Sequence, residues 1–98
     1  MSHTTTHAEA ENKTKAVKGV LNVLRRELDT STAESHYKKM TSTGLILYDE
    51  HGISYLPIQC FEAMKEVIDR STVSKDMLYV VHAILDELIE DCKQKENV

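Results

Sequence analysis

The last third of the chain has the clearest hydrophobic pattern. Between residues 76 and 92, apolar side chains recur at alternating steps of one and three residues, which is the period of a helix with a broad buried side. The members of this apolar stripe are Met77, Val80, Val81, Ile84, Leu85, Leu88, Ile89 and Cys92. The stripe takes eight of seventeen positions, which is more than one neighbouring element in a small fold is expected to cover.

Four carboxylates lie away from this stripe, and we call them the acidic ridge: Asp86, Glu87, Glu90 and Asp91. They form two like-charged pairs at a spacing of four residues, which destabilises a helix. They also lie towards the C-terminal end of the predicted helix, where the helix dipole disfavours anions. Local conflict of this kind favours a role in binding, so the ridge is the predicted partner-binding site.

A second amphipathic helix is predicted over residues 12–29. Its apolar side holds Val17, Val20, Leu21, Leu24 and Leu28. At 100° per residue, four cations project within about 100° of each other on another side, and we call them the basic stripe: Lys15, Lys18, Arg25 and Arg26. Gly19 lies inside this helix and costs about 1 kcal/mol relative to Ala. It either permits close approach of another helix or only weakens the element.

Residues 45–56 are typical of a β-hairpin. Two short runs of aliphatic, aromatic and β-branched residues, 45–48 and 53–56, flank the turn-like segment 49–52, which ends in Gly52. The alternative is one helix over 33–49 with Gly52 just beyond its end. Thr41, Thr43 and Gly44 are poor helix formers in the middle of that helix, so the hairpin is preferred.

Capping signals bound the remaining elements. Ser31 and Glu34 have the spacing of a capping box for a short helix over 32–40. Pro57 suits the start of a helix that continues to about residue 69, and Ser74 suits the cap of the last helix, which runs to about 94.

Together these elements predict an α+β fold, mostly α, with four helices and one central β-hairpin in the order α-α-β-β-α-α. An all-α helical bundle is the alternative. Residues 1–11 are expected to be a disordered N-terminal tail, 12–95 a single domain with the hairpin near 45–56, and 96–98 a frayed C-terminus.

Charge is divided unevenly along the 98 residues, whose formal net charge is −4. Residues 1–44 carry a net +2 and residues 45–98 a net −6. Such asymmetry indicates electrostatic pairing within the fold, between subunits or with a charged partner. No apolar run is long enough to span a membrane, so no membrane association is expected.

The chemistry-bearing residues are scattered. His36, His51 and His82 stand alone, and no sequence motif for metal ligands, phosphate binding or an activated nucleophile is present. We therefore predict no catalytic residue, no metal site and no cofactor, and a protein that is not an enzyme. The two cysteines, Cys60 and Cys92, have apolar neighbours and are expected to be reduced, which favours a cytoplasmic location.

The predicted function is that of a small regulatory protein acting by protein–protein contact. The acidic ridge would dock on a basic surface of a larger protein, and the chain would form a homodimer through its last two helices. The alternative is a dimeric DNA-binding transcriptional regulator that contacts phosphates with the basic stripe.

Overall fold

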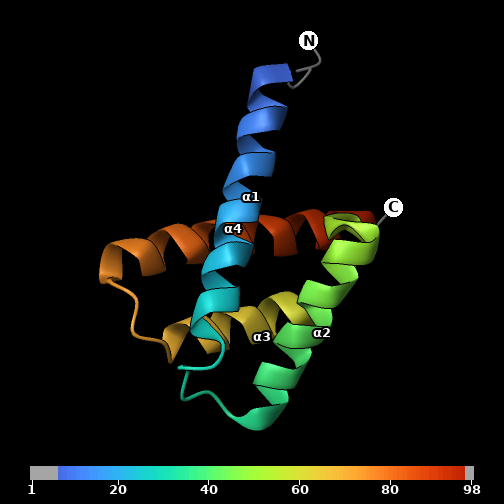
Figure 1. Cartoon of the computed structure of the whole chain (residues 1–98). Helices are drawn as coiled ribbons and strands as arrows, with labels where there is room; N and C mark the ends of the chain where they lie inside the picture. Colours follow the sequence, from blue (N-terminus) through green and yellow to red (C-terminus); the bar gives the residue numbers. More distant parts are fainter. Residues whose placement is uncertain (1–6, 97–98) are drawn as a thin grey trace.

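The computed structural model describes residues 7–96, and this part of the chain is helical (Figure 1). The elements are α1 (His7–Glu27), α2 (Ser35–His51), the short 3-10 helix η1 (Ile53–Tyr55), α3 (Ile58–Asp69) and α4 (Lys75–Glu96). Residues 1–6 of the predicted tail and residues 97–98 of the predicted frayed end lie outside the described part. Helix α1 begins earlier than the predicted start at residue 12.

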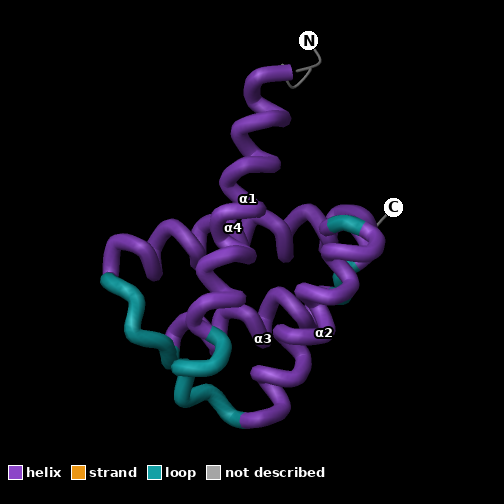
Figure 2. Tube along the Cα trace, in the orientation of Figure 1, coloured by secondary structure: helices purple, strands orange, loops and turns teal. Residues whose placement is uncertain are grey.

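Helices α3 and α4 run antiparallel and pack against each other, and α2 packs against α3 (Figure 1). Helix α1 contacts both α3 and α4 and crosses them steeply, with its first turns extending beyond the rest of the molecule (Figure 1). The connections between helices are short, as the tube view shows (Figure 2). Because α1 crosses α4 rather than lying along it, each helix leaves part of the other uncovered.

One apolar core joins the helices. Its fully buried side chains include Leu21 and Leu24 of α1, Phe61, Met64 and Ile68 of α3, and Val81 and Leu85 of α4. Burial of such side chains is the main stabilising contribution in a fold of this size. The periods predicted for the first and last helices therefore identify the correct buried sides.

The prediction of a β-hairpin near residues 45–56 is wrong. Residues 35–51 form the single helix α2, and no strand is present among residues 7–96, so the alternative of an all-α bundle fits. Gly52 ends the helix with a φ of 94°, and its N–H donates to the carbonyl of Tyr48 at 2.9 Å. A positive φ favours glycine, as the alternative reading of this segment requires.

Tertiary packing explains why the poor helix formers are helical. Thr41 is fully buried, and the Thr43 hydroxyl donates back to the carbonyl of Lys39 at 3.0 Å. A Cβ atom at Gly44 would lie 2.9 Å from Met64 Cε and 3.0 Å from Cys60 Cβ. Glycine therefore lets α2 approach α3 closely, and this contact outweighs the weak helix propensity.

The link between α1 and α2 is fastened to the end of α3. Ser31 does not form the predicted capping box: its hydroxyl donates to the carbonyl of Val67 at 2.7 Å and accepts from the N–H of Ala33 at 3.2 Å. The N–H of Thr32 donates to the carbonyl of Arg70 at 3.0 Å. These bonds fix the C-terminal end of α1 relative to α3.

The predicted cap of the last helix is present. The N–H of Met77 donates to the hydroxyl of Ser74 at 3.3 Å, in the position of an N-cap bond. Asp76 in the first turn of α4 also stabilises this end of the helix, because its negative charge interacts favourably with the positive N-terminal end of the helix dipole.

Candidate interaction surface on the first and last helices

Three of the four carboxylates of the acidic ridge already pair with lysines of other helices. Lys65 Nζ of α3 lies 2.6 Å from Asp86 Oδ1. Lys13 Nζ of α1 lies 2.9 Å from Asp91 Oδ2 and 3.2 Å from Glu87 Oε1. The like-charged pattern that conflicts with an isolated helix is therefore relieved by cations from α1 and α3.

These contacts change the proton affinity of the groups involved. The hydrogen bond from Lys65 lowers the pKa of Asp86. The hydrogen bond to Asp91 raises the pKa of Lys13, and Glu87 acts in the same direction. The pairs are largely exposed, so each contributes little to stability. Glu90 is exposed and, among residues 7–96, has no ion pair.

All four residues of the basic stripe are exposed on α1. Arg25 Nη2 lies 2.6 Å from Asp49 Oδ1 of α2, and its Nη1 donates to Asn22 Oδ1 at 3.1 Å. Within the described part of the chain, Lys15, Lys18 and Arg26 form no ion pair. The basic stripe is therefore a surface with unbalanced positive charge.

An apolar groove opens between α1 and the N-terminal half of α4, beside the basic stripe. It has a volume of about 820 Å³ and is lined by Ala16, Gly19, Val20, Asn22, Val23, Arg25, Arg26, Met77 and Val80. We call this the α1–α4 groove. Its walls come from two helices that are distant in sequence, so no local pattern identified it.

Side chains of the apolar stripe remain exposed at this groove. Val80 is 55% exposed and Met77 39% exposed, whereas Val81 and Leu85 of the same stripe are fully buried. Tyr79, which lines the depression around His82 rather than this groove, is 77% exposed. The apolar stripe is thus wider than the other helices of residues 7–96 cover, as the sequence pattern predicts. Exposed apolar side chains that gather beside a groove are typical of a binding surface.

Gly19 forms an open part of the groove. A Cβ atom built on it would meet no atom within 4 Å apart from its chain neighbours and its own helix backbone. No other helix in the described structure comes within 4 Å of that position, so the small size of Gly19 serves no contact among residues 7–96. Gly19 was expected either to permit close approach of another helix or only to weaken α1. If it permits close approach, the approaching helix must come from outside this fold.

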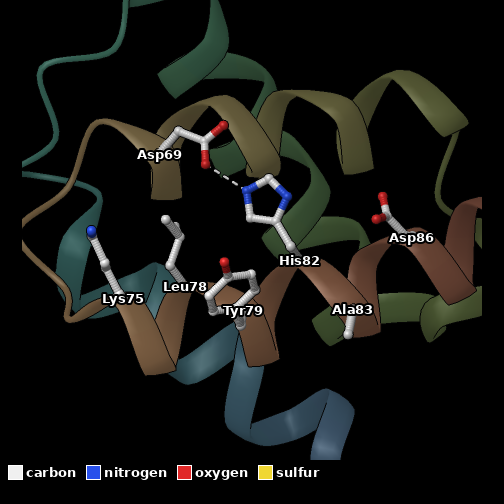
Figure 3. A pocket seen from close by; sticks show the side chains of 7 residues that line it. All are labelled: Asp69, Lys75, Leu78, Tyr79, His82, Ala83 and Asp86. Carbon is white, nitrogen blue, oxygen red and sulfur yellow. Dashed lines mark hydrogen bonds and ion pairs between the residues drawn. The ribbon is translucent and has the colours of Figure 1, made fainter.

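A second depression lies on the other side of α4, around His82 (Figure 3). His82 Nε2 contacts Asp69 Oδ1 of α3 at 2.5 Å, and Figure 3 draws no interaction from it to Tyr79 or Asp86. The lining residues include no Ser or Cys beside the imidazole, so the depression lacks a nucleophile–base pair. The His82–Asp69 contact instead fastens α4 to the end of α3.

The remaining chemistry adds no site. Residues 7–96 contain no group of three or more His, Cys, Asp or Glu side chains arranged to hold a metal ion. Neither Cys60 nor Cys92 forms a disulfide, and burial raises the pKa of the Cys60 thiol. In the described residues, no helix is both long enough and apolar enough to cross a membrane.

Comparisons with protein-family models, with curated proteins and with solved structures give no match to this chain. Functional inference therefore depends on the surface itself. The α1–α4 groove is its most distinctive feature, because it combines an apolar lining with a cationic edge.

Proposed function

We propose that this chain is a non-enzymatic regulatory protein that acts by binding an amphipathic helix in the α1–α4 groove. The observation that carries the proposal is the juxtaposition of exposed Met77 and Val80 with the cations of the basic stripe. An occupant that fits both features buries apolar side chains in the groove and presents carboxylates to Arg26, which forms no ion pair among the described residues. Arg25 lies beside it and already contacts Asp49 of its own chain. Charge complementarity of this kind selects partners and their orientation.

The small residues of α1 support a helical occupant. Ala16 and Gly19 are three residues apart and both line the groove, so a second helix can approach the α1 backbone closely. Binding of an amphipathic helix in an apolar groove is a common mode of peptide recognition. The two cysteines, neither of which forms a disulfide, are compatible with the cytoplasmic location included in this proposal.

The ion pairs of the acidic ridge favour the groove over the ridge as the main binding surface. A partner that docked on the ridge would have to compete with Lys13 and Lys65 for Asp86, Glu87 and Asp91. Only Glu90 offers a carboxylate without such competition in the described structure. Competition of this kind reduces the net gain from new ion pairs.

The test is to block the groove without disturbing the fold. We expect Gly19→Leu to weaken binding of a synthetic amphipathic helix, with Leu on one side and Glu on the other, by about tenfold or more. The leucine side chain has open space at this position, and replacing glycine favours the helix by up to about 1 kcal/mol. Fluorescence anisotropy of the labelled peptide measures the affinity.

Two controls make the result specific. Gly19→Ala changes helix propensity with little added bulk, so it should bind the peptide much as the natural chain does. The same peptide with every Glu replaced by Lys should bind weakly, because the basic stripe repels it. Equal affinity of Gly19→Leu and Gly19→Ala for the acidic peptide would show that the groove is not the binding surface.

DNA binding is the second candidate function, and the unpaired cations of the basic stripe favour it. Lys15 and Lys18 are exposed and form no ion pair among the described residues. If they contact phosphates, Lys15→Ala plus Lys18→Ala should reduce the slope of log affinity against log salt concentration by about two. Absence of detectable DNA binding by the natural chain at low salt would exclude this function.

A further inference from the structure

We propose that the occupant of the α1–α4 groove is helix α4 of a second copy of this chain. In the resulting dimer, the acidic side of α4 in each copy contacts the basic side of α1 in the other. The inference rests on the proposed function, because it names the amphipathic helix that the groove receives. Its basis is the complementary arrangement of charge on the exposed sides of α1 and α4.

The outward side of α4 has an apolar centre with a carboxylate at each end. At 100° per residue, Asp76, Tyr79, Val80 and Glu87 lie within a sector of about 100°, away from the buried Val81. Tyr79 and Val80 form the apolar centre, and Asp76 and Glu87 lie before and after it. Asp76 has no ion pair among the described residues, whereas Glu87 lies 3.2 Å from Lys13 Nζ of its own chain, so contact with a second copy would share this carboxylate between two cations. Glu90 lies in the same sector, one turn further on.

The exposed side of α1 has the opposite arrangement. Lys15 and Lys18 precede the open surface at Gly19, and Arg25 and Arg26 follow it. The exposed side of α1 has a small residue at its centre and cations at both ends. It therefore complements the outward side of α4, which has apolar residues at its centre and anions at both ends.

The spacing of the charges also matches. Lys15 and Arg26 are eleven residues apart, as are Asp76 and Glu87. Each pair spans about 16 Å of helix at a rise of about 1.5 Å per residue. Two helices placed side by side so that the two spans coincide bring both anions opposite both cations, with Gly19 between the two cations. This holds for either relative chain direction, because each span has the same sign of charge at both ends.

Two other contacts between copies, one through α1 alone and one through α3, are disfavoured. Two α1 helices packed at Gly19 would bring like-charged basic stripes together, which is unfavourable. Helix α3 has no large exposed apolar side chain, since α1, α2 and α4 pack around it. A twofold pair that exchanges α4 instead uses the same contact twice and covers Val80 and Tyr79 in both copies.

The test is the oligomeric state of charge-swapped full-length variants, measured by sedimentation equilibrium. The natural chain should be a dimer at micromolar concentration and should dissociate as salt is raised. The basic-swapped variant (Lys15→Glu plus Arg26→Glu) and the acid-swapped variant (Asp76→Lys plus Glu87→Lys) should each dimerise at least about tenfold more weakly. An equimolar mixture of the two should recover the dimer, because every contact between copies regains opposite charges.

Gly19→Leu supplies an independent check, since it should be monomeric while retaining its helical circular dichroism. Circular dichroism melts of both swapped variants establish that they fold, and recovery in the mixture could not arise from two unfolded chains. A monomeric natural chain, a Gly19→Leu variant that dimerises as the natural chain does, or a mixture that stays monomeric would each overturn the exchange of α4. A monomer that still binds the acidic peptide, with Gly19→Leu impaired, would overturn this inference alone and leave the groove's proposed function intact.

Discussion

Gly19 and Gly44 illustrate how the same residue type serves two opposite purposes in two helices. Gly44 is buried where α2 meets α3, and an added Cβ would press on Cys60 and Met64. Gly19 is exposed and has open space beside it. Sequence alone gives both positions the same weak helix propensity, because the difference comes from neighbours that are distant in the chain.

The same substitution should therefore have different effects at the two positions. We expect Gly19→Ala to stabilise the fold by up to about 1 kcal/mol, through helix propensity alone. Gly44→Ala gains the same propensity but overpacks the α2–α3 contact, which costs about 1–3 kcal/mol. Gly44→Ala should thus be the less stable of the two variants by about 1–3 kcal/mol. Urea unfolding followed by circular dichroism measures the difference.

A Gly44→Ser variant extends this comparison, because it adds one more atom at the same contact. Its stability should fall below that of Gly44→Ala. If Gly44→Ala proves as stable as Gly19→Ala, then α2 and α3 separate at negligible cost, and close packing does not explain the glycine.

At the scale of the element, the sequence pattern of α4 predicts the buried side of the helix but not its contacts with other helices. The spacing of Val81, Leu85 and Leu88 correctly predicts a helix and its buried side. It does not reveal that Lys13 and Lys65 neutralise the acidic ridge, because these lysines come from other helices. A charge pattern that conflicts with an isolated helix is therefore not by itself evidence for an external partner.

The Asp86–Lys65 pair predicts a pH dependence of stability. The pKa of Asp86 is lower in the folded chain than its usual value near 3.8, so the unfolded chain binds this proton more readily. Its contribution is present above the unfolded pKa and is lost as pH falls through the folded pKa. Since the pair is largely exposed, removing it should cost less than about 1 kcal/mol at neutral pH.

Asp86→Asn isolates this contribution. The natural chain should be slightly more stable than Asp86→Asn at pH 7, and the two should converge in strong acid, in urea titrations at matched salt. Lys65→Met serves as the matched control, because it removes the other partner of the same pair. A difference between Asp86→Asn and the natural chain that is constant from neutral to strongly acidic pH would contradict the prediction.

At the scale of the whole molecule, sequence periodicity predicts the outer helices well and the middle of the chain poorly. The hairpin prediction for residues 45–56 fails because the helix continues through Thr41 and Gly44, just before this segment. Thr41 is buried there, and Gly44 packs closely against α3. The groove was not predicted because Gly19 and Val80 line one groove only after α1 crosses α4. The signals that were visible are the excess width of the apolar stripe and a glycine inside an amphipathic helix.

The hydrogen bonds of Ser31 and Thr32 to Val67 and Arg70 have a kinetic consequence. They hold the end of α1 on α3, which in turn packs on α4, so the two walls of the α1–α4 groove are linked through α3. A receptor surface that is already in its final shape loses little conformational entropy on complex formation. For the binding proposed above, the encounter rate is therefore expected to be limited by diffusion, orientation and ionic steering rather than by a rearrangement of the groove's own backbone.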